Sequence, residues 1–346
     1  MTPRADSGQR RGDEGVTLVW AACFLFAALW CVALAVDIGK VMAARTELQA
    51  AADAAALAGA SAIDPDTGDI VQDSARVRAA AVAFKNEAYE GVTTPIVIDP
   101  INDVDFPEPD RVRVTVRRED ATGNPVVLHF AQTVGIPNLD VRAQATAEAQ
   151  QLTEICENLA PFAPTQPPNG VPFSTDCDST YTLKVGASEN QQGNFQLLDL
   201  PDCNEDTWTG PGGGANAVKY YTVNGYDCCL GIGDEVPTQP GNEVGPVRDA
   251  LQTRWDADTD KTSNCYQDYT GNGKRVFNTP IIETFDVNGK KMVRILGFAA
   301  FFLRERPQGS MSQQGVSGQF IKMVAPGNAG ENPPEDAGIY GVHLVE

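Results

Sequence analysis

The chain has 346 residues, 42% of them hydrophobic and 21% charged, and its formal net charge at pH 7 is −20. Three basic and three acidic side chains balance within the first 15 residues, so the excess negative charge lies beyond them. A chain this acidic repels phosphate backbones and anionic headgroups, which argues against a nucleic-acid partner.

An uncharged run of 21 residues, 16–36, dominates the N-terminal part of the sequence. As a helix it would be about 30 Å long, which is the thickness of a bilayer's hydrocarbon core. A buried helix of a soluble protein would be amphipathic, whereas this run is apolar on every side. A cleaved signal peptide is the other alternative, but the run is long for one and residues 37–40 make a poor cleavage site. We therefore predict a retained single-pass membrane helix.

Basic residues set the expected orientation. Arg4, Arg10 and Arg11 precede the apolar run and favour a cytoplasmic N-terminus, although Lys40 and Arg45 follow it. We predict an inner-membrane protein whose residues 1–15 form a cytoplasmic tail and whose C-terminal domain is extracytoplasmic.

The cysteines support that location. Two lie in the apolar run, and an even number lie in the Gly- and Pro-rich sequence beyond it, which favours disulfides in an oxidising compartment. These six disulfide candidates are Cys156, Cys177, Cys203, Cys228, Cys229 and Cys265. Six free thiols are the alternative, and zinc has less support because the sequence has no C-x-x-C pair or His-bearing ligand cluster. The adjacent pair, Cys228 and Cys229, is expected to bond to two different partners rather than to itself, which leaves 12 connectivities open.

Residues 37–150 are predicted to form a small α+β module. Its Ala-rich beginning continues the apolar run as one helix to about residue 63, roughly 70 Å long in all, with Gly39 as the expected bend. The residues Ala75, Val77, Ala81 and Phe84 of a second helix are expected to face the first. The other expected elements are a turn at 64–68, the second helix at 70–89, strands at 95–98, 111–118 and 139–148, and a short helix at 126–135.

The small-residue stripe of the first helix is expected to contain Leu48, Ala52, Ala55, Leu57 and Gly59. Beyond residue 150, Pro, Gly, Asn and Asp become frequent and helical periodicity nearly disappears. We predict a β-rich domain over 151–346 with one clear helix, at 245–255. The strand candidates are 181–185, 195–200, 218–223, 276–282, 292–303 and 320–324.

Three N-terminal patterns together resemble a known family. Arg-Arg-x-x-x-Gly at 10–15 precedes the apolar run, Val-Asp-Ile-Gly at 36–39 follows it, and TELQAAADAAALA occupies 46–58. This order resembles the N-terminal region of Tad-like Flp pilus-assembly proteins of the TadE/TadG type. Looser similarity to TadG-like proteins continues in GNFQLLDL from Gly193, PGNEVGP from Pro240, CYQDYTGNGKRV from Cys265 and LGFAAFFL from Leu296. The resemblance implies a bacterial envelope protein that assists Flp pilus assembly and tight adherence.

Two candidate sites have plainer alternatives. Prepilin-like proteins are cut after a Gly before the apolar run and need Glu at the fifth mature position. Gly15 is suitably placed, but the fifth residue after it is Trp20, which favours an uncut anchor. Asp256, Asp258 and Asp260 have the spacing that begins an EF-hand loop, but the later Gly and Glu positions hold Lys261 and Gln267. A solvated acidic loop is the favoured interpretation, and no metal or cofactor is predicted.

Catalysis has little support in the sequence. No nucleophile motif or phosphate-binding loop appears, and Gly212-Gly213-Gly214 lacks a following Lys and helix, so it is expected to be a flexible loop. His129 is expected to be structural, in a short helix near the module's core. We predict a non-enzymatic scaffold with membrane and pilus-assembly or envelope proteins as partners and no small-molecule substrate. The alternatives are an envelope binding or sensing module without pili, and a processed pilin-like subunit.

Overall fold

The computed structural model describes residues 13–89, 93–165, 173–184, 194–200, 213–226, 228–241, 243–284, 289–308, 316–330 and 338–345. They divide into two units. The first contains the described residues of Met1–Ala55, Ala80–Val104 and Val114–Ala145, and the second those of Ala56–Ala79, Asp105–Arg113 and Thr146–Glu346. The α+β fold class, with a long N-terminal helix and a β-rich, disulfide-braced C-terminal region, is confirmed.

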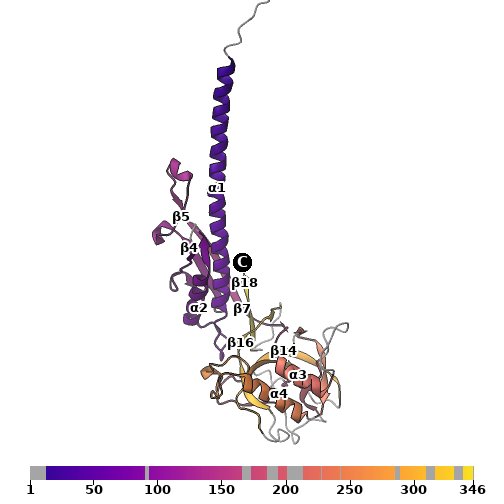
Figure 1. Cartoon of the computed structure of the whole chain (residues 1–346). Helices are drawn as coiled ribbons and strands as arrows, with labels where there is room; N and C mark the ends of the chain where they lie inside the picture. Colours follow the sequence, from indigo (N-terminus) through magenta and orange to yellow (C-terminus); the bar gives the residue numbers. More distant parts are fainter. Residues whose placement is uncertain are drawn as a thin grey trace, which may run out of the picture. The chain divides into compact units, whose positions relative to one another are not determined.

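Helix α1, Asp13–Ala60, joins the apolar run and the Ala-rich segment in 48 continuous residues (Figure 1). The helix is continuous through Gly39, where a bend was expected. Most apolar side chains of its first half are exposed, including Phe24 at 77% and Trp20 at 72%. Among the described residues, this is the one helix long and apolar enough to cross a membrane.

The second half of α1 buries a stripe of small residues. Spacings of three and four place its members on one helix face. They are Ala44, Leu48, Ala51, Ala52, Ala55, Ala56, Gly59 and Ala60. Leu57 was expected in this stripe but is half-buried, outside its spacing. A Cβ on Gly59 would lie 2.8 Å from Val112 Cγ1, so strand β4 (Arg111–Arg118) approaches the helix too closely here for any larger residue.

The turn after α1 has the predicted chemistry. Asp64 Oδ1 accepts the N–H groups of Asp66 at 2.8 Å and Thr67 at 2.9 Å. Helix α2, Gln72–Lys85, follows and is shorter than expected.

The expected contact face of α2 is wrong in all but Ala75. Ala75, Ala79 and Ala83 are fully buried, whereas Val77 and Phe84 are exposed. Ala81 is exposed as well. The three buried alanines recur every four residues, and this spacing of the smallest side chain permits close helix packing.

Strand β4 alternates as predicted, with Val112, Val114 and Val116 buried. Strand β7, Val141–Gln151, also alternates and buries its alanines. A five-stranded sheet has the order β16-β18-β7-β4-β3, with β3 at Val104–Asp105, β16 at Met323–Val324 and β18 at Ile339–Val345. β1 (Glu87–Tyr89) and β2 (Thr93–Pro95) form a separate hairpin, and Ile96 and Ile98 of the strand expected at 95–98 are buried outside it.

The short helix predicted at 126–135 is absent. Strand β5, Val126–Val127, pairs with β6, Asn138–Leu139, and a 3₁₀ turn, η2 (Ala131–Val134), lies between them. Gly135 ends this turn with φ of 92° and donates its N–H to Gln132 O at 3.1 Å. We call residues 126–139 the β5–β6 hairpin.

The β-rich part of the second unit is built around β14, Met292–Leu303. It has the strand order β10-β12-β14-β15-β9, and β13 also pairs with β14. The other strands are β9 (Tyr181–Lys184), β10 (Asn194–Leu198), β12 (Glu235–Pro240), β13 (Val276–Ile282) and β15 (Val316–Ile321). The last seven residues of β14 and all of β13 are buried, as near-continuous apolar runs require.

Two helices belong to the same unit. The predicted helix at 245–255 is α4, Val244–Ala257. The strand predicted at 218–223 is wrong, because α3 spans Ala215–Asn224 and buries Ala217, Val218, Tyr221 and Thr222 along one helical face. The β-branched and aromatic residues of this segment favour a strand, but the burial of one helical face decides its conformation. A three-stranded sheet, β11-β8-β17, joins Leu230–Gly231, Glu154–Ile155 and Gly327–Asn328.

Candidate functional site

The carboxylate of Asp37 fixes the β5–β6 hairpin to α1. Asp37 is the first charged residue after the apolar run, and it is only 2% exposed. Its Oδ1 accepts the backbone N–H of His129 at 2.9 Å, and its Oδ2 accepts those of Phe130 at 2.9 Å and Ala131 at 2.7 Å. One side chain therefore satisfies three consecutive N–H groups.

These three donors lie at the start of the 3₁₀ turn η2. Backbone N–H groups at the start of a helical turn have no partner within it and attract anions. Asp37 supplies that partner from 92 residues away along the sequence. The sequence did not predict this role of Asp37. It also predicted that His129 lies near the core, whereas His129 is exposed.

Lys40 adds a second contact about one turn further along α1. Its Nζ donates to Val127 O at 2.7 Å. Further on, Gln49 Nε2 donates to Gln144 O of β7 at 3.1 Å and to Asp53 Oδ1 at 2.8 Å. Three polar residues that follow the apolar run in α1 thus contact other segments: Asp37 and Lys40 contact the hairpin, and Gln49 contacts β7.

An apolar groove lies where the hairpin meets the end of the apolar run. Its volume is about 360 Å³. The walls include Phe26, Leu29, Trp30 and Val36 of α1 and Phe130 and Thr133 of the hairpin. Figure 1 shows the hairpin, marked by β5, beside α1. The groove offers van der Waals contact and almost no hydrogen-bonding groups, so it suits an apolar occupant.

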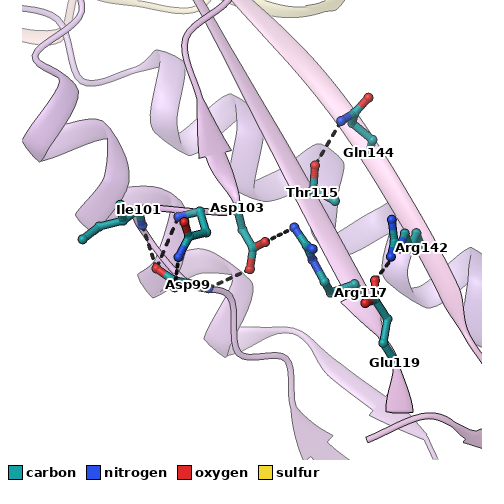
Figure 2. A network of polar contacts seen from close by, with 9 residues as sticks. Asp99, Ile101, Asp103, Thr115, Arg117, Glu119, Arg142 and Gln144 are labelled. Atoms are coloured by element: carbon teal, nitrogen blue, oxygen red, sulfur yellow. Dashed lines mark hydrogen bonds and ion pairs between the residues drawn. The ribbon is translucent and has the colours of Figure 1, made fainter. Parts of the chain in front are cut away.

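A polar network stabilises the sheet of the same unit (Figure 2). Arg117 pairs with Asp103, and Arg142 pairs with Glu119. Gln144 Nε2 donates to Thr115 Oγ1 at 3.0 Å, joining β7 to β4. These groups hold one another in place, as structural ion pairs do.

Asp99 completes this network at the turn before β3. Its carboxylate accepts N–H from Ile101 at 2.9 Å and is bonded by the amide of Asn102. The Ile101 N–H, followed by the Asn102 side chain and N–H, lowers the pKa of Asp99 below its ordinary value. The backbone N–H of Asp99 donates to Asp103 Oδ2 at 2.8 Å. The side chain closes a turn.

The acidic loop at Asp256–Asp260 is not the solvated loop that was predicted. Asp258 is 4% and Asp260 8% exposed. Asp258 Oδ1 accepts the N–H of Asp260 at 2.8 Å, and its Oδ2 accepts the N–H of Arg275 at 3.1 Å and the hydroxyl of Tyr269. Asp256 forms two 2.9 Å hydrogen bonds with Arg306.

Asp260 is equally engaged by protein donors. Its carboxylate accepts N–H groups from Thr262 at 2.9 Å and from Ser263 and Thr270 at 3.1 Å, besides the Ser263 hydroxyl. These donors, the Ser263 hydroxyl first, hold the pKa of Asp260 well below its usual range. The three carboxylates serve different groups, so this arrangement is that of a structural loop.

Arg275 is the buried cation behind this loop. Its guanidinium donates to four carbonyl oxygens, those of Leu303 at 2.8 Å, Ser263 at 2.7 Å, Arg304 at 3.0 Å and Asp260 at 3.1 Å. It also lies over the rings of Trp255 at 4.0 Å and Phe302 at 4.4 Å. Burial lowers the pKa of Arg275, but guanidinium groups stay charged in proteins. Nothing in the sequence pattern around Arg275 distinguishes it from a surface arginine.

The cysteines of the second unit are paired where the structure describes them. Cys156 is bonded to Cys229, and Cys177 to Cys265. Cys228 is also disulfide-bonded, and Cys203 lies outside the described residues. Glu154 lies near the Cys156–Cys229 pair, but sulfurs bonded to each other are not metal ligands. Cys23 and Cys31 are free and exposed on α1.

Two glycine predictions have different outcomes. Gly212 lies outside the described residues, but Gly214 directly precedes α3, so the expectation that no helix follows the glycine run is wrong. Gly15 belongs to α1, and its processing stays a prediction.

Comparison with known proteins gives one match. No curated protein and no solved structure matches the chain. Residues 15–62 match the family model described as putative Flp pilus-assembly TadE/G-like. The matched segment contains Asp37, Lys40 and Gln49, whose contacts position the hairpin and β7. Over residues 15–62, the chain is therefore similar to the TadE/G-like proteins of Flp pilus assembly.

Proposed function

We propose that this chain is a non-enzymatic, single-pass protein of the bacterial inner membrane that anchors and scaffolds Flp pilus assembly. One observation carries the proposal: the Tad match coincides with α1, an apolar span continued by an Ala-rich helix with no break between them. Residues of that helix hold the hairpin through Asp37 and Lys40, so the matched segment is itself the support for a folded module.

The proposed orientation has the N-terminus in the cytoplasm and the acidic β-rich unit outside. Disulfides at Cys156–Cys229 and Cys177–Cys265 support an oxidising compartment for that unit. Arg10 and Arg11 before the span favour the same direction. The mechanism is positional, because the anchor tethers a large acidic surface to the membrane.

A scaffold also fits the way buried charges are used. Asp258, Asp260 and Arg275 satisfy one another and nearby carbonyl groups instead of facing a substrate. The partners we propose are other pilus-assembly proteins of the envelope.

Deletion of the gene tests the pilus role. Cells without the protein should show fewer Flp pili and less surface adherence at an unchanged growth rate, and the full chain supplied in trans should restore both. Normal pili and adherence in the deletion strain would favour an envelope binding or sensing module. Recovery of the protein as a main filament component beginning at Val16 would make it a processed pilin-like subunit.

Protease added to spheroplasts tests the orientation. Digestion should remove the β-rich unit and leave a protected N-terminal fragment of roughly four kilodaltons, since residues 1–36 are shielded by the membrane and cytoplasm. Protection of the whole chain would reverse the orientation.

A further inference from the structure

We infer that the β5–β6 hairpin is a second membrane contact, inserted into the headgroup and upper acyl region of the bilayer beside α1, with a lipid acyl chain in the groove. This inference rests on the membrane anchor of the proposed function and is independent of the pilus role. The juxtaposition that carries it is the groove that Phe130 and Thr133 line together with residues of the apolar run itself.

The contacts show which part of the hairpin lies beside which part of α1, from the end of the hairpin far from the apolar run to the end beside it. Its base, Val127, is bonded by Lys40, four residues beyond the apolar run. Its middle, His129 to Ala131, is bonded by Asp37 at the end of that run. Phe130 and Thr133 then line a groove whose other wall runs from Val36 back to Phe26, about 15 Å of helix rise. A helix that crosses the bilayer through residues 16–36 therefore brings the hairpin to lipid depth.

The composition of the hairpin suits that position. Between Asp120 and Asp140 the sequence has no Asp, Glu, Lys or Arg, although 21% of the whole chain is charged. Five of its apolar side chains are at least 43% exposed: Val127, Phe130, Val134, Ile136 and Leu139. Apolar exposure of this density on an otherwise acidic chain marks a surface that meets an apolar medium.

Lipid is the occupant that the geometry favours over a protein. The groove is continuous with the apolar helix surface, which is lipid-exposed if the span is inserted. Backbone N–H groups without partners are costly to place in hydrocarbon. Asp37 accepts hydrogen bonds from three such groups of the hairpin, so their free-energy cost of entering the lipid is reduced. The exposed tip residues Val134 and Ile136 add the burial energy that holds interfacial segments in a bilayer.

Depth-dependent quenching by nitroxide lipids tests the inference on the full chain in phosphatidylcholine vesicles. The background variant carries Cys23→Ala and Cys31→Ala, and its labelling under non-reducing conditions measures any reaction at the outer cysteines. Three single-label proteins are compared: Val134→Cys in the hairpin, Ile101→Cys as the matched control, and Cys23→Ala alone, which leaves Cys31 in the span. Ile101 is 76% exposed in the same unit but outside the hairpin.

The label at Val134→Cys should be quenched by a nitroxide near the acyl carbonyl several-fold more than the label at Ile101→Cys. Adding Phe130→Glu to Val134→Cys should weaken that quenching, because a carboxylate resists entry into lipid. Quenching at Cys31 without quenching at Val134→Cys would overturn the inference and leave the anchor intact. Disulfide-linked dimers through Val134→Cys without quenching would assign the surface to a second copy. Absence of quenching at Cys31 would refute the anchor and this inference together.

Discussion

The Asp37 carboxylate and the Ala131 N–H lie 2.7 Å apart, although 94 residues separate them in the sequence. Asp37 therefore accepts hydrogen bonds from a turn that is distant in the sequence, and these bonds attach the hairpin to α1. Charge-assisted hydrogen bonds of this kind are among the strongest that a protein makes.

Asp37→Asn should loosen the hairpin while leaving α1 formed. The amide has one acceptor oxygen in place of two and turns donors toward the N–H groups of Phe130 and Ala131. Hydrogen exchange at His129, Phe130 and Ala131 in detergent should accelerate by roughly tenfold or more. Asp53→Asn is the control, because Asp53 accepts from Gln49 on its own helix, and it should leave those three amides unchanged. Equal exchange in both variants would remove the capping role of Asp37.

Cys156→Ser should destabilise the second unit by on the order of 2–5 kcal/mol, the usual loss for a native disulfide. The bond closes a loop of 73 residues beside the pairing of Ile155 with Leu230. Chemical denaturation of the full chain in detergent measures the loss. Cys23→Ser, at a free cysteine, should change the midpoint little. A Cys156→Ser protein with the wild-type midpoint would show that the bond does not brace this unit.

Arg275→Lys should lower stability by about 3–5 kcal/mol despite keeping the charge. An ammonium group has three donors at one point and cannot reach four carbonyls, so buried acceptors lose their partners. The planar guanidinium that lies over the Trp255 ring and over the Phe302 ring is lost as well. Arg248→Lys is the control, because Arg248 of α4 is only half-buried and pairs with the neighbouring Asp249; it should change stability by less than about 0.5 kcal/mol. Similar effects of the two substitutions would mean that the hydrogen bonds of the buried Arg275 guanidinium are not required for stability.

The stability of the second unit should fall below about pH 4, partly because of Asp260. Its pKa is lower in the folded chain than the value of about 3.9 for an unfolded one. The unfolded state therefore takes up protons first as pH falls. The contribution of Asp260 is full above the unfolded pKa and is lost progressively as the pH falls from there through the lower, folded pKa. Thermal melting at several pH values measures this slope.

Asp260→Asn should melt lower at pH 7 and show a shallower loss on acidification than the unchanged chain. Ser263→Ala, which removes the largest single cause of the shift, should give an intermediate slope. An unaltered slope in Asp260→Asn would exclude Asp260 as a contributor to acid sensitivity.

The sequence predicted correctly those elements in which the local residue pattern matches the burial seen in the fold. The alternation of Val112, Val114 and Val116 was sufficient for β4, because one face of the strand is buried along its length. The uncharged run and the alanines after it were sufficient for α1, since helix propensity and apolarity agree there.

Prediction failed where a distant residue decides the local conformation. The hairpin at 126–139 has the apolar residues of a short helix, but Asp37 takes the N–H groups that such a helix would use. The acidic loop at 256–260 has the composition of a solvated segment, but Arg275 and Tyr269 lie behind it. No spacing within either segment reveals these partners, because the contacts exist only once the chain has folded.

Strand β18 lies between β16 and β7, and it pairs Tyr340 with Gln151 through Val345 with Thr146. During synthesis, one edge of β7 must therefore wait for a partner that emerges 189 residues later. At about 5–20 residues per second this delay is on the order of 10 to 40 seconds. Thr146, Glu148 and Gln150 line the half-exposed side of the waiting strand, and polar side chains of this kind discourage pairing between unfinished chains. β18 is thus the strand whose synthesis completes this sheet.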